Sequence, residues 1–329
     1  MRSRFWKTTT RLFCGGLALV SAHAFLIACG ALPPDRADGA STDPSFESWW
    51  RDGRAEMNGY TFRVNRYGEE RKGEAVMIFV TEPFSLSMRV KVDDPSAKPD
   101  DTVDVLKLNF VRDFQTGIYD YNTMTSLFSK SSDFSPLKIS FSSAEWCGHV
   151  YDELLFGNAK IDERFFSYFE GESSERELAR PEGGITEEEL YILLRGLRGA
   201  YLEPGRSRTV PFLPEAFYRR LVHQPAEWTK AVISRSSAGE KVTVAAGDFR
   251  VDRFKVQVES GRVGEFRVES EYPHRIITWT WTDAGESPQK RLGGGSFSGE
   301  LMGSDRLAYW KLHGEADAAA LSKMGLRSR

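Results

Sequence analysis

The segment Glu145-Trp146-Cys147-Gly148-His149 holds the residue types best suited to chemistry in this chain. Cys147 and His149 are two residues apart, and such residues point to the same face of a β-strand, where an imidazole could activate a thiol for nucleophilic attack. The sequence shows no orienting acid or oxyanion site beside them, and a lone thiol outside the cytoplasm is open to oxidation. We therefore interpret Cys147 as a small packed residue and keep catalysis by this pair as an alternative.

Metal and cofactor sites are not predicted. Cys147 and His149 have no partner at a familiar ligand spacing, and the other histidines downstream of the leader, His223, His274 and His313, stand alone. The glycine run at 293–295 is not followed by the lysine and Ser/Thr of a phosphate-binding loop. The sequence thus contains no recognisable catalytic residue, metal site or cofactor site.

Cys29 is the other thiol with a specific chemistry. It ends the segment Leu26-Ile27-Ala28-Cys29, after a basic start and an apolar stretch from Leu12 to Ile27. This pattern matches the lipobox of bacterial lipoproteins, in which the thiol is acylated and the preceding segment is removed. We predict a signal peptide over residues 1–28, lipidation of Cys29 by palmitate-like chains and a lipidated tether over 29–43. Gly30 follows in place of aspartate, which favours the periplasmic side of the bacterial outer membrane.

Charge and cysteine content restrict the protein class. The leader contains four of the 44 basic residues and none of the 47 acidic ones, so the mature chain has 40 basic and 47 acidic residues, a net charge of −7. This balance argues against a nucleic-acid partner. Once Cys14 is removed with the leader and Cys29 is acylated, Cys147 has no partner for an intramolecular disulfide. The fold must therefore rest on its apolar core.

Alternation with a period of two dominates the chain from Tyr60 onward. Ile277, Trp279 and Trp281 share one face of a predicted strand, whereas residues 76–80 are apolar at every position, as in a strand covered on both faces. We expect about a dozen strands in a mainly β fold. It is a large curved antiparallel sheet or open half-barrel, or two stacked β halves, with a few short helices.

Three short helices interrupt this pattern. One begins near Pro44, a second follows the capping box formed by Thr186 and Glu189 and runs to about Gly199, and a third lies around Phe217. The expected organisation is an N-terminal β region at 44–184, a helical connector at 185–225, a C-terminal β region at 226–315 and a tail at 316–329.

A curved sheet of this size must fill its concave face with side chains, a plug or a guest molecule. We expect Trp279 and Trp281 to line that face and the helical stripe with Leu193 and Leu197 to act as a lid. Residues 113–126 read as a loop at the rim of the opening. The predicted ligand-binding residues are Trp279, Trp281, Leu193, Leu197, Tyr119 and Tyr121, and the predicted polar cluster is Asp113, Trp146, Cys147 and His149.

Several segments together resemble a family of bacterial outer-membrane lipoproteins, some of which carry the label septum formation inhibitor Maf. The segments are W-W-x-D-G-x-A-E at 49–56, D-F-Q-T-G-I-Y at 113–119, E-W-C-G-H at 145–149, V-A-A-G-D-F-R-V-D-R-F at 244–254, P-H-R-I-I-T-W at 273–279 and L-A-Y-W at 307–310. The C-terminal segments resemble a periplasmic β domain of unknown function, similar to the half-barrels of lipoprotein-localisation carriers. The pyrophosphatase activity of true Maf proteins is not implied, because their S-P-R-R segment is absent.

The expected function is therefore that of a membrane-anchored periplasmic lipoprotein without enzymatic activity. It would bind an apolar ligand, a lipid or an envelope protein on its curved sheet, and its lipid anchor would bind the membrane. The alternatives are an enzyme that uses Cys147 and His149, and a purely structural envelope scaffold.

Overall fold

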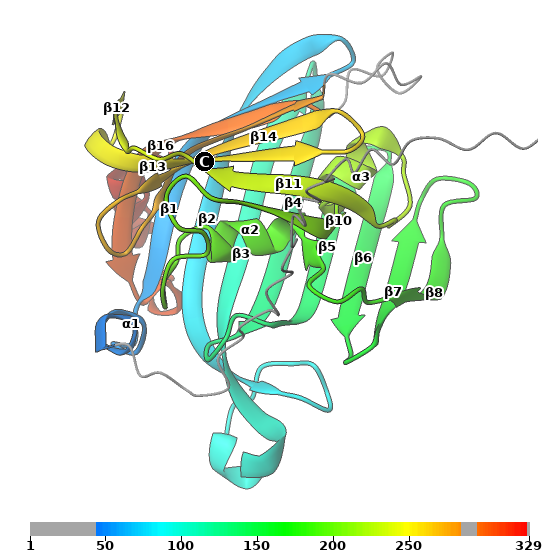
Figure 1. The fold of residues 1–329 in the computed structure, drawn as a ribbon, viewed down its shortest axis with the longest axis horizontal. Helices are drawn as coiled ribbons and strands as arrows, with labels where there is room; N and C mark the ends of the chain where they lie inside the picture. Colours follow the sequence, from blue (N-terminus) through cyan, green and yellow to red (C-terminus); the bar gives the residue numbers. More distant parts are fainter. Residues whose placement is uncertain (1–43, 284–294, 328–329) are drawn as a thin grey trace, which may run out of the picture. The chain divides into compact units, whose positions relative to one another are not determined.

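The computed structural model describes residues 44–283 and 295–327, which form one large, curved and unclosed β-sheet (Figure 1). The predicted signal peptide, Cys29 and the tether lie outside the described residues. The strand order is β8-β7-β6-β5-β4-β3-β2-β1-β16-β15-β14-β13-β11-β10-β9, with β12 paired to β13. The prediction of a mainly β fold with one curved antiparallel sheet is confirmed.

The strands follow the alternating segments of the sequence. Their bounds are β1 (Ala55–Arg66), β2 (Glu69–Ser85), β3 (Thr102–Thr116), β4 (Tyr119–Lys130), β5 (Pro136–Glu145), β6 (Gly148–Phe156), β7 (Lys160–Ser167), β8 (Ser174–Ala179), β9 (Ile185–Thr186), β10 (Ser207–Leu213), β11 (Thr229–Arg235), β12 (Glu240–Val244), β13 (Gly247–Val258), β14 (Arg262–Glu269), β15 (Ile276–Asp283) and β16 (Phe297–Leu307). Consecutive strands from β1 to β8 pair as antiparallel hairpins, and β16 pairs with β1. The N-terminal and C-terminal strands therefore belong to one continuous sheet, and among the strands of the described residues only β9 and β10 pair in parallel.

Two helices pack against the concave face of the sheet. Figure 1 shows α2 (Glu187–Leu193) and α3 (Ala216–Val222) in front of the central strands. All seven residues of α3 are buried, as are the first six of α2. Contacts between arginine and acidic side chains join this helical region to the sheet, and they give the buried guanidinium groups hydrogen-bond partners. The contacts are Glu187–Arg262, Glu215–Arg112, Arg219–Asp152, Arg220–Glu145 and Arg195–Glu56.

The convex face is covered over β1, β2 and β16 by the C-terminal segment. Met324 and Leu326 are buried there against Val80 and neighbouring apolar residues. Gly59 permits this close approach, because an added Cβ would lie 2.1 Å from the backbone oxygen of Met324. This packing explains why residues 76–80 are apolar at every position and confirms that both faces of that strand are covered.

The helix predictions are correct in position but not always in length. Helix α1 (Pro44–Trp50) buries Phe46 and Trp50, and α2 begins after Thr186, whose backbone N–H donates to the Glu189 carboxylate at 2.8 Å. Helix α2 ends at Leu193 rather than near Gly199, because tight turns follow at residues 194–196. No helix in the described ranges is long and apolar enough to cross a membrane.

The prediction of a loop over residues 113–126 is wrong. These residues lie in strands β3 and β4, which are joined by the two-residue turn Gly117-Ile118. Polar and aromatic residues mix in this segment because its strands alternate between the packed concave face and the exposed convex face. The composition resembles that of a loop, although the backbone is extended on both sides of the Gly117-Ile118 turn.

Candidate functional site

Three neighbouring hairpins end in two-residue turns at the same end of the sheet. The turns are Tyr67-Gly68 between β1 and β2, Gly117-Ile118 between β3 and β4, and Trp146-Cys147 between β5 and β6. Strands β1 to β6 are adjacent in the sheet, so the three turns are neighbours in space. The antiparallel pairing of the strands places these residues together.

The interpretation of Cys147 as a packed residue is wrong. Cys147 is a free, exposed thiol in the β5–β6 turn, where Glu145 pairs with Gly148 across the hairpin. Gly148 has a φ of +154°, which side-chain-bearing residues rarely adopt, and this allows the tight turn. Cys147 therefore does not share a strand with His149, so the expected same-face geometry does not apply.

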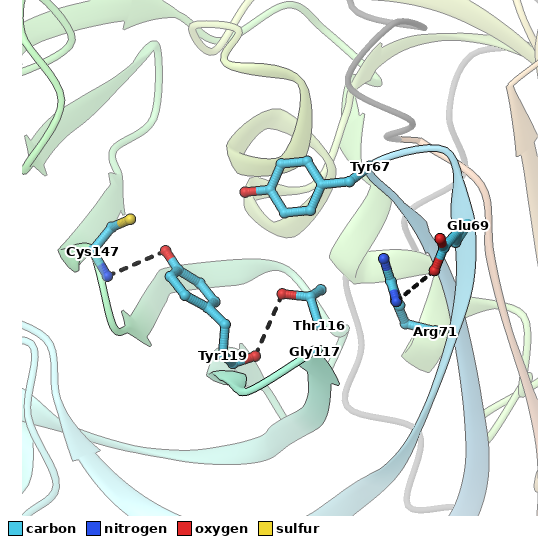
Figure 2. Close-up of a pocket in the computed structure, with 7 residues that line it drawn as sticks. All are labelled: Tyr67, Glu69, Arg71, Thr116, Gly117, Tyr119 and Cys147. Atoms are coloured by element: carbon cyan, nitrogen blue, oxygen red, sulfur yellow. Dashed lines mark hydrogen bonds and ion pairs between the residues drawn. The ribbon is translucent and has the colours of Figure 1, made fainter.

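A pocket of about 500 Å³ opens between these turns (Figure 2). Its lining residues are Tyr67, Glu69, Arg71, Thr116, Gly117, Tyr119 and Cys147. Apolar surface predominates, and an ion pair between Glu69 and Arg71 lies at one side at 2.7 Å. We call this site the tip pocket. It is an open hollow at the surface rather than an enclosed cavity, and its lining is mainly apolar with a few polar groups.

Aromatic rings connect the pocket to the core beneath it. Tyr119 lies 5.2 Å from Tyr121 and 6.3 Å from Trp146 between ring centroids, while Tyr121 stacks on Phe114 at 4.5 Å. The hydroxyl groups of Tyr67 and Tyr121 are hydrogen-bonded at 3.0 Å. The rings support one another, so the pocket wall is built before any ligand arrives.

The Tyr119 side chain in the tip pocket is held by two hydrogen bonds at its hydroxyl group. Its hydroxyl donates to Glu145 at 3.1 Å and accepts from the backbone N–H of Cys147 at 3.2 Å. Burial raises the pKa of Tyr119 well above its ordinary value, and the nearby Glu145 carboxylate adds to the effect. The phenol therefore stays neutral and serves to position the β5–β6 turn. Glu145 is in turn bound by Arg220 of α3.

The predicted polar cluster does not assemble into one contact group. Asp113 and His149 lie in the same cross-strand row, through Asn122 and Ala144, and are thus three strand spacings or about 14 Å apart. Trp146 and Cys147 are in the adjacent turn. In the two described ranges, no three His, Cys, Asp or Glu residues are arranged to hold a metal ion.

The predicted ligand-binding residues fall into two groups. Tyr119 and Tyr121 belong to the tip pocket and its support, whereas Trp279, Trp281 and Leu197 are buried in the core and Leu193 packs against that core. The Trp279 ring contacts Tyr60, Phe110 and Tyr191 at centroid distances of 4.8, 5.4 and 6.2 Å. Protein side chains thus fill the surroundings of this ring. A role for the two tryptophans in ligand binding stays a prediction.

Sequence reasoning missed Tyr67, Glu69 and Arg71 as pocket residues, whereas Thr116 and Gly117 lie in the segment 113–126 that it assigned to the rim of the opening. A local signal was present, because Tyr67-Gly68 separates two alternating segments by two residues, as in a tight hairpin. That signal locates a turn. It does not say which other turns lie beside it.

Comparisons with known proteins identify no family for this chain. No protein-family model matches it, and no curated protein does. Among solved structures, it is similar to an exported protein with a YmcC-like fold from Bacteroides fragilis, at 10% identity over 76% of this chain and 95% of that chain, with a TM-score of 0.21. A likeness at this TM-score carries no weight for fold or function.

Proposed function

We propose that this protein is a membrane-anchored lipoprotein of the bacterial envelope that binds an apolar ligand in the tip pocket and catalyses no reaction. The observation that carries the proposal is the contrast between two surfaces. The concave face is filled by α2, α3 and buried aromatic rings, whereas the tip pocket is open and mainly apolar. Burial of apolar ligand surface there would be favourable by about 25 cal/mol per Å².

An acyl chain is the ligand class that fits this lining best. The Tyr67 and Tyr119 rings offer apolar walls, and the Glu69–Arg71 pair with the Thr116 hydroxyl offers polar contacts at one side. A chain with an apolar body and a polar end would satisfy both. The acyl groups of lipids and of other lipoproteins have this chemistry.

Two substitutions at Cys147 test the proposal. The protein is the chain from residue 30 onward, which lacks the acylated cysteine and retains every described element, and the probe is a brominated fatty acid that quenches tryptophan emission. Cys147→Ala should bind as the unmodified chain does, because it leaves the pocket open. Cys147→Phe should weaken binding at least about tenfold, because the ring occupies the pocket.

The same pair of variants separates the alternatives. An enzyme that uses Cys147 as a nucleophile would lose its function in Cys147→Ala, which a binding pocket tolerates. If the probe causes no quenching at saturation, or if both variants bind it equally well, the tip pocket does not bind acyl chains and a structural scaffold becomes the better interpretation.

A further inference from the structure

Large apolar side chains occupy the turns at one end of the sheet, where about half or more of each side chain is exposed to solvent. Two-residue hairpin turns usually carry Gly, Asn or Asp, which suit the backbone and the solvent. Here the three turns each combine one large apolar residue with Gly or Cys and contain no charged residue. Ile118 is 78% exposed, Trp146 64% and Tyr67 48%. Packing against Tyr121 and Tyr119 uses part of the Tyr67 and Trp146 rings and leaves the rest of each ring exposed.

A fourth residue extends the row. Tyr168 begins the connection between β7 and β8, at the same end of the sheet, and is 65% exposed. Its ring lies against Gly148, beside the β5–β6 turn, since an added Cβ on Gly148 would be 2.4 Å from it. We call Tyr67, Ile118, Trp146 and Tyr168 the tip surface. Neighbouring hairpins are two strand spacings apart, so the row spans about 30 Å.

The opposite end of the same strands differs in composition. The connection between β4 and β5 reads Ser-Ser-Asp-Phe-Ser at 131–135, with its Phe134 buried, and the connection between β6 and β7 reads Gly-Asn-Ala at 157–159. The β13–β14 turn, at the tip end but beyond β1, reads Glu-Ser-Gly at 259–261. Exposed Met88 and Val90 in the β2–β3 connection are an exception at the far end. The two-residue turns with large apolar residues are thus concentrated at one end of β1 to β6, and the β7–β8 connection beside them carries Tyr168 together with Glu170 and Glu172.

The chemistry of the tip surface fits the interface of a lipid bilayer. Tyrosine and tryptophan prefer the headgroup region, where the ring is partly apolar and its polar end stays hydrated, and isoleucine prefers the acyl region. The three short turns offer no positive charge, and the exposed Glu69 beside them is paired with Arg71. Charge complementarity therefore matches a zwitterionic surface rather than an anionic one.

We infer that the tip surface inserts into the interface of a zwitterionic lipid bilayer, as a membrane contact separate from the predicted anchor at Cys29. The residues of the tip surface lie in separate connections that project beyond the ends of the strands. Each connection can therefore enter the headgroup layer without rearrangement of the sheet. The tip pocket opens among the same turns and would face the membrane. Only the statement that the tip pocket faces the membrane rests on the proposed function.

Vesicle co-sedimentation tests the inference on the chain from residue 30 onward, with phosphatidylcholine vesicles. The unmodified chain should bind, and binding should change little when salt is raised. Ile118→Ser/Trp146→Ser/Tyr168→Ser should reduce the partition coefficient at least about tenfold, because three inserted side chains are lost. The matched control, Met88→Ser/Val90→Ser, removes exposed apolar residues at the far end and should bind as the unmodified chain does.

Quenching by brominated phosphatidylcholine gives a second measurement, which begins with the unmodified chain. Emission of the unmodified chain should fall, and Trp146→Phe should remove most of that fall. The inference is overturned if the unmodified chain neither sediments nor is quenched, if the control loses as much binding as the triple variant, or if the chain self-associates through the tips instead. Ile118 and Tyr168 do not line the tip pocket, so loss of vesicle binding in Ile118→Ser/Tyr168→Ser with retained fatty-acid binding separates this inference from the proposed function.

Discussion

Arg195, just after helix α2, and Glu56, in strand β1, form an ion pair in which Nη2 lies 2.9 Å from Oε1 and 3.0 Å from Oε2. Neither side chain reaches solvent, with exposed fractions of 0% and 1%. The guanidinium also donates to the backbone oxygen of Pro273 at 2.9 Å and lies 4.4 Å from the centre of the Phe79 ring. This single side chain therefore links the helical connector to strand β1 and to the connection just before β15.

Replacing Arg195 with Met should lower the free energy of unfolding by about 3–5 kcal/mol, because it leaves the Glu56 carboxylate buried without its counter-charge. The double change Arg195→Met/Glu56→Leu should cost less than the single one. Arg63→Met, which breaks the exposed pair with Glu70, is the control and should cost under about 1 kcal/mol. Denaturant unfolding measures all three. A single-variant cost as small as the control's would mean that the pair does not hold the connector.

Glu215 should make the protein less stable as the pH rises through neutrality. Burial raises the pKa of Glu215 to about 8, with Glu187 and Glu188 adding to the shift and Arg112 opposing it. The unfolded chain has an ordinary carboxyl pKa, so the folded state binds more protons between the two values. The stabilisation from this group is complete below about pH 4.5 and is lost as the pH approaches 8.

Comparison with Glu215→Gln isolates that contribution. The free energy of unfolding of the unmodified protein should fall relative to the variant between about pH 5 and 8. Parallel profiles for the two proteins would show that Arg112 keeps Glu215 ionised throughout this range.

Gly299→Ala tests the packing of Trp279. An added Cβ at Gly299 would lie 1.9 Å from the Trp279 ring, so the ring or the strand must move. Overpacking of this kind should lower the free energy of unfolding by about 1–3 kcal/mol and shift the tryptophan emission. Ser298→Ala, at the neighbouring position of β16, should change the free energy of unfolding and the emission spectrum by little. An unchanged emission spectrum in Gly299→Ala would count against the packed state of this ring.

Cys29→Ser tests the anchor predicted from the lipobox. The unmodified chain should incorporate radiolabelled palmitate and sediment with membranes, since each buried CH2 contributes about 0.8 kcal/mol. The variant should lose the label and its processing before residue 29. A variant that is cleaved at the same place and is equally membrane-bound would disprove lipidation at Cys29.

Local patterns in the sequence determined the elements of this fold. Alternation placed Ile277, Trp279 and Trp281 on one buried face, and the Thr186–Glu189 pair located the start of α2. Such signals operate over a few residues, so they act before any tertiary contact exists. The same locality explains the wrong predictions. A polar convex face made residues 113–126 look like a loop, and Trp146-Cys147 lacks the Asn or Gly that usually marks a turn.

The tertiary structure alone decided where the candidate site lies. The tip pocket joins Tyr67, Tyr119 and Cys147 from three hairpins, and no spacing in the sequence relates one hairpin to the next. The concave face is filled because the connector is bound to strands far away in the chain, as Arg195 is to Glu56, 139 residues apart. Strand order and buried charge pairing are long-range properties. Because these long-range contacts fill the concave face of the sheet, the open apolar surface lies at the ends of the hairpins.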